Sequence, residues 1–177
     1  MFRLHRLLML ALVVFTSAGA NATNQGYDVI TAKVGEQSEL LVINLADRSS
    51  HWYVVGGVGG NRMLGTDFAG FHFLAELAAS SDYQYLAVVS VGEGHPLLEI
   101  IDLPLWLEQG VYQVLHALNP YPGDFELQGW QGHTLHFAST GELDYPLSPV
   151  AGTTEPLQQP VQYQFDVTSG RLTKPPQ

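Results

Sequence analysis

The stretch that decides the fold is Ser80–Leu103, SSDYQYLAVVSVGEGHPLLEIIDL. It contains two apolar runs rich in β-branched residues, joined by a short segment with two glycines. Such runs, bounded by turn residues, predict two paired strands. Similar runs recur outward from this hairpin along most of the chain, so we expect an all-β protein.

Ten segments show the alternation or the apolar composition of strands. They are Tyr27–Val34, Glu39–Leu45, Trp52–Val55, Phe71–Leu77, Tyr85–Val91, Leu97–Leu103, Val111–Leu118, Phe125–Gln128, Thr134–Ala138 and Val161–Val167. One short helix is predicted at Pro104–Gln109, which has a proline at its start and Gly110 after its end. Two segments, Gly56–Gly70 and the proline-rich Tyr145–Pro160, lack alternation. We interpret both as loops and as candidate rims of a binding site.

Parts of the hairpin recur later in the chain. Ser81–Val88 aligns with Trp130–Phe137, and Ile101–Leu103 aligns with Phe165–Val167. Ile43–Leu45 gives a third partial copy. Repeated units of consecutive strands are typical of propeller blades.

These units resemble the blades of periplasmic TolB-like and prolyl-oligopeptidase-type β-propellers. The strongest match is DVTSGRLT, Asp166–Thr173, while the usual turn proline is absent from both copies and the Asp-Gly pair is intact in neither. The resemblance implies antiparallel blade-like units at about 39–118 and 124–173, with the loop 145–160 inside the second. A closed propeller needs ~4–8 blades. We therefore expect an incomplete propeller, with a β-sandwich or meander as the alternative.

The first 22 residues have the three parts of a secretory signal peptide. Arg3 and Arg6 precede the apolar run Leu7–Phe15, and Ala20-Asn21-Ala22 ends the segment. The apolar run is much shorter than the ~20 residues of a membrane-spanning helix. We expect residues 23–177 to form a single exported domain. The absence of cysteine favours a bacterial periplasmic or secreted protein.

The chain is acidic, with a formal net charge of −10. It has no cluster of Lys or Arg, so nucleic acid and anionic membrane surfaces are poor partners. The open edges of an incomplete propeller need cover or a partner strand. We expect a monomer whose edges are covered by Tyr27–Val34 and by the loop 145–160, with self-association into a ring as the alternative.

Neither a metal site nor a nucleophile emerges from the sequence. His133 and His136 are three apart on a predicted strand, which places them on opposite faces. The other candidate histidines, His51, His72, His95 and His116, show no ligand spacing. Ser90 lacks the first glycine of a nucleophile elbow, and Gly57–Arg62 lacks the third glycine of a dinucleotide loop.

Carboxylates and aromatic residues near turns are the remaining candidates for a site. The carboxylates are Glu93, Asp124, Glu126, Glu142 and Asp144, and the aromatic residues are Trp52, Tyr53, Trp106, Tyr121 and Trp130. Acids of this kind hold calcium or form glycosidase pairs, but no pairing can be assigned from spacing.

The sequence thus predicts a binding or protein-interaction module without catalytic residues, metal or cofactor. Its partner would be another protein or a component of the cell envelope. The alternative is a periplasmic hydrolase that acts on a glycan or peptide through loop carboxylates.

Overall fold

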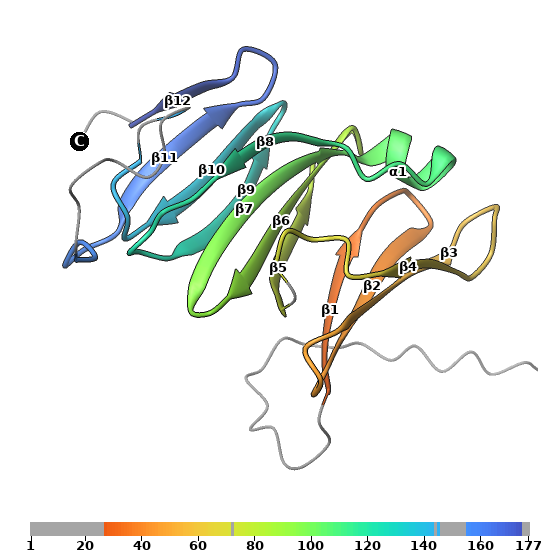
Figure 1. The fold of residues 1–177 in the computed structure, drawn as a ribbon. Coiled ribbons are helices and arrows are strands. Elements are labelled where there is room, and N and C mark those ends of the chain that lie inside the picture. Colours follow the sequence, from red (N-terminus) through yellow and green to blue (C-terminus); the bar gives the residue numbers. More distant parts are fainter. Residues whose placement is uncertain (1–26, 72, 144, 146–154, 175–177) are drawn as a thin grey trace, which may run out of the picture.

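A computed structural model describes residues 27–71, 73–143, 145 and 155–174, which form three four-stranded antiparallel sheets (Figure 1). The first sheet comprises β1 (Tyr27–Lys33), β2 (Ser38–Leu45), β3 (Ser50–Gly56) and β4 (Arg62–Thr66); the second β5 (Phe73–Ala79), β6 (Tyr85–Gly92), β7 (His95–Asp102) and β8 (Val114–Leu118); the third β9 (Phe125–Gln131), β10 (Thr134–Ser139), β11 (Val161–Asp166) and β12 (Arg171–Thr173). Each sheet pairs its strands in chain order. The prediction of an all-β protein with propeller-like blades is confirmed.

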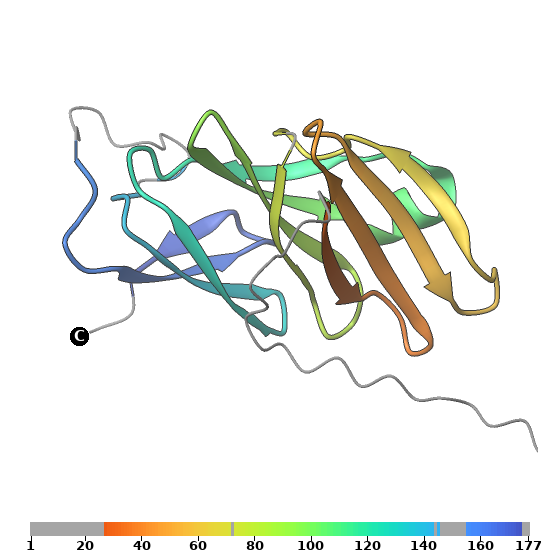
Figure 2. The ribbon, with the colours of Figure 1, turned by 90° about the horizontal axis from the view of Figure 1, so that it is seen from below.

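The three sheets form a row with the second sheet in the middle (Figure 2). The first strands of neighbouring sheets lie side by side, β1 next to β5 and β5 next to β9. This is the arrangement of propeller blades, in which the first strands gather at the centre. The first and third sheets each have one face that no other sheet of the described residues covers.

The structure divides the predicted unit 39–118 between two sheets. This unit covers most of the first sheet and all of the second. The boundary between the two sheets was not recognised because β4 lies in Gly56–Gly70, which lacks the alternation of a strand. Gly65 on β4 has φ +154°, and the Phe68 ring lies within 2.7 Å of the position that a Cβ would take. A glycine in a strand permits this close approach. Because it has no side chain, it also interrupts the alternation by which a strand is recognised in the sequence.

Two further expectations are corrected by the strand order. Ile43–Leu45 ends the second strand of its sheet, whereas Ile101–Leu103 and Phe165–Val167 stand at the ends of third strands, so the third partial copy is not equivalent to the others. Tyr27–Val34 covers no edge, because Tyr27–Lys33 is itself a regular strand paired with β2. Of the loop 145–160, residues 146–154 lie outside the described residues, as does the predicted signal peptide 1–22.

The position of the second sheet explains the apolar runs in Ser80–Leu103. Val88 of β6 packs toward the first sheet, while its neighbours Ala87 and Val89 pack toward the third. On β7, Ile101 and Ile100 divide in the same way. A strand with both faces buried needs no polar side, so the run is continuous rather than alternating.

The predicted helix forms as α1 (Leu103–Gln109) between β7 and β8. The Asp102 carboxylate accepts a hydrogen bond from the Leu105 N–H at 2.8 Å, and Gly110 ends the helix at φ 73°. These are the usual N-cap and left-handed C-cap. The helix carries the buried Trp106 onto Trp52 and Phe68, with ring centroids 5.5 and 5.1 Å away.

Side chains also tie the sheets together by hydrogen bonds to the first strands. Asn44 binds both backbone groups of Leu74, and the Glu76 carboxylate accepts the Leu127 N–H at 2.8 Å. The Trp130 indole N–H donates to the carbonyl of Ala78 at 2.9 Å. These contacts satisfy backbone groups of β5 and β9 on the edges that pair with no other strand of the described sheets.

Candidate functional site

A cleft with a volume of about 810 Å³ lies at the end of the second sheet next to the first. Its lining residues are Arg48, Phe71, Phe73, Val91, Gly92, Glu93, Gly94 and His95. Phe73 is 43% exposed, which is unusual for phenylalanine. We call this cleft, defined by those eight residues, the Phe73 cleft.

The two turns that border the Phe73 cleft are fixed by local chemistry. Glu93 and Gly94 join β6 to β7 with φ 53° and 81°, the signs of a two-residue hairpin turn. In the turn between β2 and β3, the Asp47 carboxylate accepts hydrogen bonds from the Ser49 hydroxyl and N–H, which lower the pKa of Asp47. Arg48 has φ 72° in that turn and is exposed.

The floor of the cleft is held in place from behind by the second sheet. The Phe71 N–H donates to the hydroxyl of buried Ser90 at 3.1 Å, and the Gly70 N–H donates to the Glu99 carboxylate at 2.8 Å. A Cβ on Gly92 would come within 2.6 Å of the Phe71 ring, so the ring depends on this glycine for its place. Ser90 is therefore a positioning residue for the aromatic floor.

An aromatic pair continues the cleft toward the third sheet. The His95 ring meets Tyr121 edge to face with centroids 4.5 Å apart, and Tyr121 is 44% exposed. The cleft thus combines an apolar floor with one guanidinium, one carboxylate and one imidazole. This chemistry suits an apolar side chain that is flanked by polar or charged groups.

Glu99, which holds Gly70, is 6% exposed, and burial raises its pKa. It also accepts the Tyr112 hydroxyl at 3.2 Å, and burial together with the Glu99 charge raises the pKa of Tyr112. A raised carboxyl pKa means that the native state binds the proton more tightly than the unfolded state. Stability therefore falls as pH rises from the ordinary value of 4.5 through the raised one.

We expect Glu99→Gln to raise the free energy of unfolding at neutral pH by roughly 1–2 kcal/mol, the scale of an imperfectly compensated buried polar group. The gain should vanish below the ordinary carboxyl pKa, where Glu99 is protonated in both states. Urea unfolding of both proteins across pH 4 to 8 measures the difference. Burial also raises the pKa of Glu76, but that contribution is common to both proteins and cancels. A difference that does not change with pH would contradict the assignment.

The histidines singled out from the sequence lie apart. His133 stands in the turn between β9 and β10 rather than on the strand, and it binds Asp82 at 3.0 Å. His136 on β10 lines a hollow beside Gln128–Gln131. Because His133 precedes β10, the prediction that both histidines lie on one strand was wrong for His133. His51 is on β3, and His72 lies outside the described residues. No group of three or more metal-ligating side chains is present in the part of the chain that the structure describes.

His116 connects the second and third sheets. Its Nε2 lies 2.9 Å from the carbonyl oxygen of Val167, and its Nδ1 lies 2.8 Å from the Tyr145 hydroxyl. A carbonyl only accepts, so Nε2 carries a proton and, in the neutral ring, the Tyr145 hydroxyl donates to Nδ1. Both ring nitrogens of His116 therefore have hydrogen-bond partners that help to hold the second and third sheets together.

The candidate carboxylates are distributed over three hollows. Glu93 is in the Phe73 cleft, while Asp124 and Glu126 line a small hollow of about 180 Å³. Glu142 is in a third hollow, and Asp144 is outside the described residues. Among the described acids of this set, none shares a hollow with Glu93.

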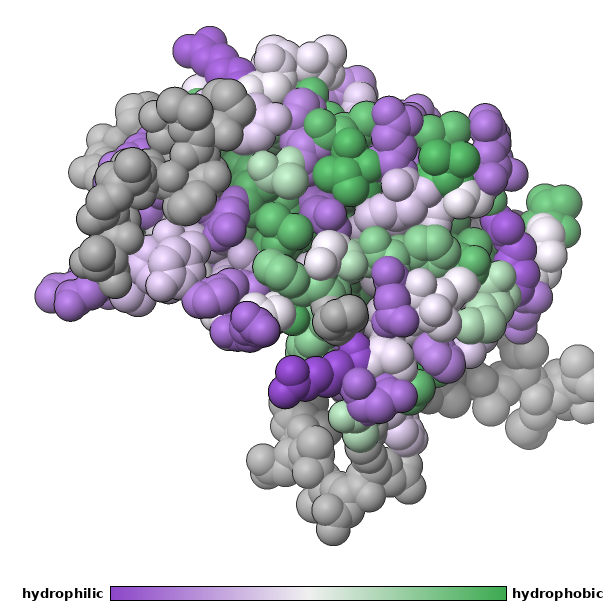
Figure 3. All heavy atoms as spheres, in the orientation of Figure 1, coloured by the Kyte–Doolittle hydropathy of each residue, from purple (hydrophilic) through white to green (hydrophobic). Residues whose placement is uncertain are grey.

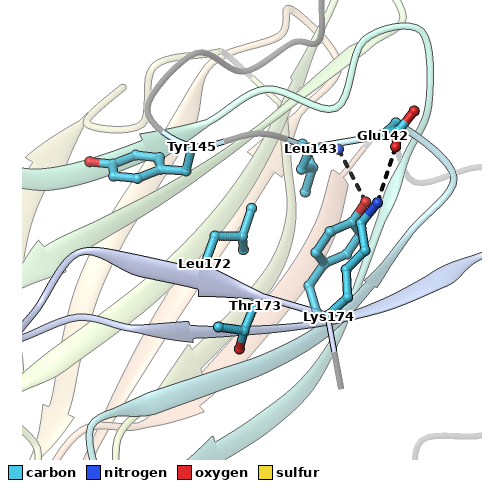
Figure 4. Close-up of a pocket in the computed structure, with 7 residues that line it drawn as sticks. Glu142, Leu143, Tyr145, Leu172, Thr173 and Lys174 are labelled. Carbon is cyan, nitrogen blue, oxygen red and sulfur yellow. Dashed lines mark hydrogen bonds and ion pairs between the residues drawn. The ribbon is translucent and has the colours of Figure 1, made fainter. Parts of the chain in front are cut away.

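The third hollow, of about 370 Å³, lies beside β12 (Figure 4). The Lys174 ammonium binds the Glu142 carboxylate at 3.1 Å, which raises the pKa of Lys174, and it lies 5.7 Å from the Tyr163 ring centre. The Tyr163 hydroxyl accepts the Leu143 N–H at 3.1 Å. The charged groups here are already paired with each other, so this hollow is a weaker candidate than the Phe73 cleft.

The aromatic candidates divide between core and surface. Trp52 and Trp106 are fully buried, and Trp130 stacks on Tyr85 between the sheets. Tyr121 borders the Phe73 cleft through His95. No local sequence signal points to Arg48, Phe71 or Phe73 as site residues, although the predicted rim Gly56–Gly70 ends directly before Phe71.

Comparisons with known proteins bear on the fold. No protein-family model matches the chain, and no curated protein matches its sequence. An uncharacterized protein of Listeria monocytogenes is similar in structure, with a TM-score of 0.58 and 13% identity over 89% of this chain and 42% of that one. TolB of Acinetobacter baumannii gives a TM-score of 0.51 and 15% identity over 82% of this chain and 31% of TolB.

The chain spans less than half the length of either similar structure. Identities this low show a shared fold and carry no information on activity. The chain therefore shares with TolB, a β-propeller, the blade-like arrangement of antiparallel sheets.

Proposed function

We propose that this protein is an exported, non-catalytic interaction module that binds a protein segment in the Phe73 cleft. The observation that carries the proposal is the cleft itself, in which the exposed Phe73 and its neighbour Phe71 form an apolar floor beside Arg48. Binding residues concentrate on loops that a rigid scaffold positions, and this cleft is built from turns of two packed sheets. Aromatic and arginine side chains are also the residues that dominate protein interfaces.

The chemistry of the cleft indicates a class of ligand. An aromatic or branched aliphatic side chain would fill the space over Phe71 and Phe73, and a nearby carboxylate would meet Arg48. The chain has a formal net charge of −10, so Arg48 is a local cation on an acidic protein. A segment with one acid beside an apolar residue fits better than a strongly acidic one, which the whole surface would repel.

The hydrolase alternative receives less support from the carboxylates. Asp124 and Glu126 line the same hollow, but they are two residues apart on one stretch of chain. A glycosidase pair acts from the two sides of the scissile bond. Two acids on one wall of a small hollow do not provide that arrangement.

Binding in the cleft can be tested with peptides displayed on phage and selected on the purified protein. We expect selected peptides to combine an apolar residue with an acidic one. Phe73→Ala and Arg48→Ala should each weaken a selected peptide about tenfold or more, since such residues are frequent hot spots. Gln164→Ala on the far sheet is the matched control and should bind normally. Peptides that bind all four proteins equally would rule out the cleft.

Export is the second part of the proposal, and it rests on the signal-like residues 1–22. In the described part of the chain, no helix is long and apolar enough to cross a membrane. We expect the intact mass of the protein from a periplasmic or culture fraction to match a chain that starts at Thr23. Recovery of the full-length chain, with Met1, in the membrane fraction would contradict export.

A further inference from the structure

The outer face of the first sheet, which points away from the second sheet, is apolar. It carries the outward-pointing side chains of four strands, and most of these are apolar: Tyr27, Val29, Leu41, Ile43, Leu45, Tyr53, Val55 and Met63. The uncharged polar members are Thr31, His51 and Thr66. Val29 is 45% exposed and Met63 50% exposed. Figure 2 shows the first sheet at one end of the row, with no further sheet of the described residues beyond it.

The register assembles these side chains into continuous rows. Val29 pairs with Ile43, and Leu41 pairs with Tyr53, which in turn pairs with Met63. Residues that pair directly across antiparallel strands point to the same face. The apolar side chains therefore form one patch and not isolated exposures of the kind that most protein surfaces have.

The sequence of β2 shows that this face is unusual for an end sheet. Leu40 and Val42 point inward and are fully buried, while Leu41 and Ile43 between them point outward. Such a run, apolar on both sides, is typical of strands covered on both faces. The run in β6 has the same character, and there the cause is a sheet on each side.

The other end of the row has the opposite chemistry. In β11, Tyr163 and Phe165 are buried, whereas Gln162, Gln164 and Asp166 alternate with them and point away from the core. This is the regular pattern of a strand with one solvated face. The free face of the third sheet therefore needs no partner, and the free face of the first sheet does.

The contrast decides between two ways in which copies can associate. A head-to-tail ring would place the first sheet of one copy on the third sheet of the next, burying Gln162 and Gln164 against aliphatic side chains without hydrogen-bond partners. A two-fold dimer instead places the first sheet of one copy on the first sheet of the other. Only the second arrangement matches apolar surface with apolar surface.

We propose that a second copy of this chain covers the outer face of the first sheet in a two-fold symmetric dimer. Four strands ~4.8 Å apart and seven residues of ~3.3 Å each give a face of about 19 by 23 Å in projection. Two such faces, with the corrugation of their side chains, approach the ~1,200 Å² at the lower end of specific interfaces. An interface of this size lies at the small end of specific contacts, so we expect the dimer to dissociate on dilution.

Local charge is compatible with this contact. The charged side chains on the face include Lys33 and Glu39, which pair across β1 and β2 and cancel each other. The acidity of the chain therefore opposes the dimer only at long range, and salt weakens that repulsion. The sequence-based expectation of a monomer concerned the open strand edges and did not consider this sheet face.

Introduced cysteines test the dimer directly, because the chain has none of its own. Ile43→Cys lies near the middle of the outer face, where a two-fold axis brings equivalent residues together. We expect a short bis-maleimide to convert most of the Ile43→Cys protein into a covalent dimer. Gln164→Cys, on the free face of the third sheet, is the matched control and should stay monomeric.

Sedimentation at micromolar concentration supplies the second measurement. The unmodified protein should sediment at twice the chain mass, and Ile43→Asp should sediment at the chain mass with its far-ultraviolet circular dichroism unchanged. Ile43 lies outside the Phe73 cleft, so peptide binding should persist in Ile43→Asp. Peptide binding by this variant therefore separates a failure of the dimer from a failure of the proposed function. An unmodified protein that is monomeric would overturn the dimer, and so would cross-linking through Gln164→Cys instead of Ile43→Cys.

Discussion

Trp52→Ala is expected to lower the free energy of unfolding by about 3–5 kcal/mol, the usual cost of truncating a buried tryptophan. Trp52 is fully buried between the first and second sheets, and its ring meets Phe68 and Trp106 at centroid distances of 6.2 and 5.5 Å. Its indole N–H also donates to the Ser50 hydroxyl at 2.9 Å. Truncation opens a cavity and removes the contact of Trp52 with Trp106 on α1.

Urea unfolding monitored by circular dichroism measures this effect. Val58→Ala is the matched control, because Val58 is fully exposed in the turn that follows β3, and it should change stability by no more than about 0.5 kcal/mol. A loss below about 1 kcal/mol for Trp52→Ala would show that the two sheets do not depend on this cluster. Such a small loss is outside the range of buried aromatic truncations.

The same cluster shows what could be predicted from sequence. The end of the helix at Gly110 followed from the preference for glycine at the C-cap, and Trp106 lies on that helix. The strands of the second sheet were predictable because both of their faces are buried, which leaves long apolar runs. The strand β4 was missed because a glycine and its packing partner Phe68 replace alternation there.

The Phe73 cleft could not be predicted, for a different reason. Arg48 and Phe73 are far apart in the sequence and belong to different sheets, and only the packing of those sheets brings them to one cleft. Single residues such as Arg48, in a turn with positive φ, carry no pattern that a local window detects. Figure 3 shows hydrophobic residues reaching the surface among hydrophilic ones, a mixture that composition alone does not locate.

Both failures of prediction involve contacts between sheets, which local sequence patterns do not reveal. Asn44 is another such contact. It sits on β2 among apolar neighbours, where the sequence shows only one polar residue in an apolar run. In the structure it is 2% exposed, donates from Nδ2 to the Leu74 carbonyl at 2.7 Å and accepts the Leu74 N–H at 3.1 Å. One amide thus replaces a strand partner on the unpaired edge of β5.

Asn44→Leu should lower the free energy of unfolding by about 2–6 kcal/mol, because it leaves both the N–H and the carbonyl of Leu74 buried without partners, at about 1–3 kcal/mol for each. Chemical unfolding measures the loss. Gln162→Leu, at an exposed position of β11 on the free face of the third sheet, is the matched control for replacing an amide by leucine, and it should change stability by no more than about 0.5 kcal/mol. An Asn44→Leu protein as stable as the unmodified one would show that the two backbone groups find other partners.

Asn44→Asp separates the hydrogen bonds from the shape of the side chain. In this variant the ionised carboxylate still accepts the Leu74 N–H but turns a negative oxygen toward the Leu74 carbonyl, whereas the protonated carboxyl donates to that carbonyl as the amide does. Burial and the carbonyl raise the pKa of the introduced carboxyl, so the variant is most stable at low pH and loses stability as pH rises through the raised value. The stability gap between Asn44→Asp and the unmodified protein should therefore narrow on going from pH 8 to pH 4. A gap that is constant over this range would mean that Asn44 acts by packing and not by bridging the first sheet to the second.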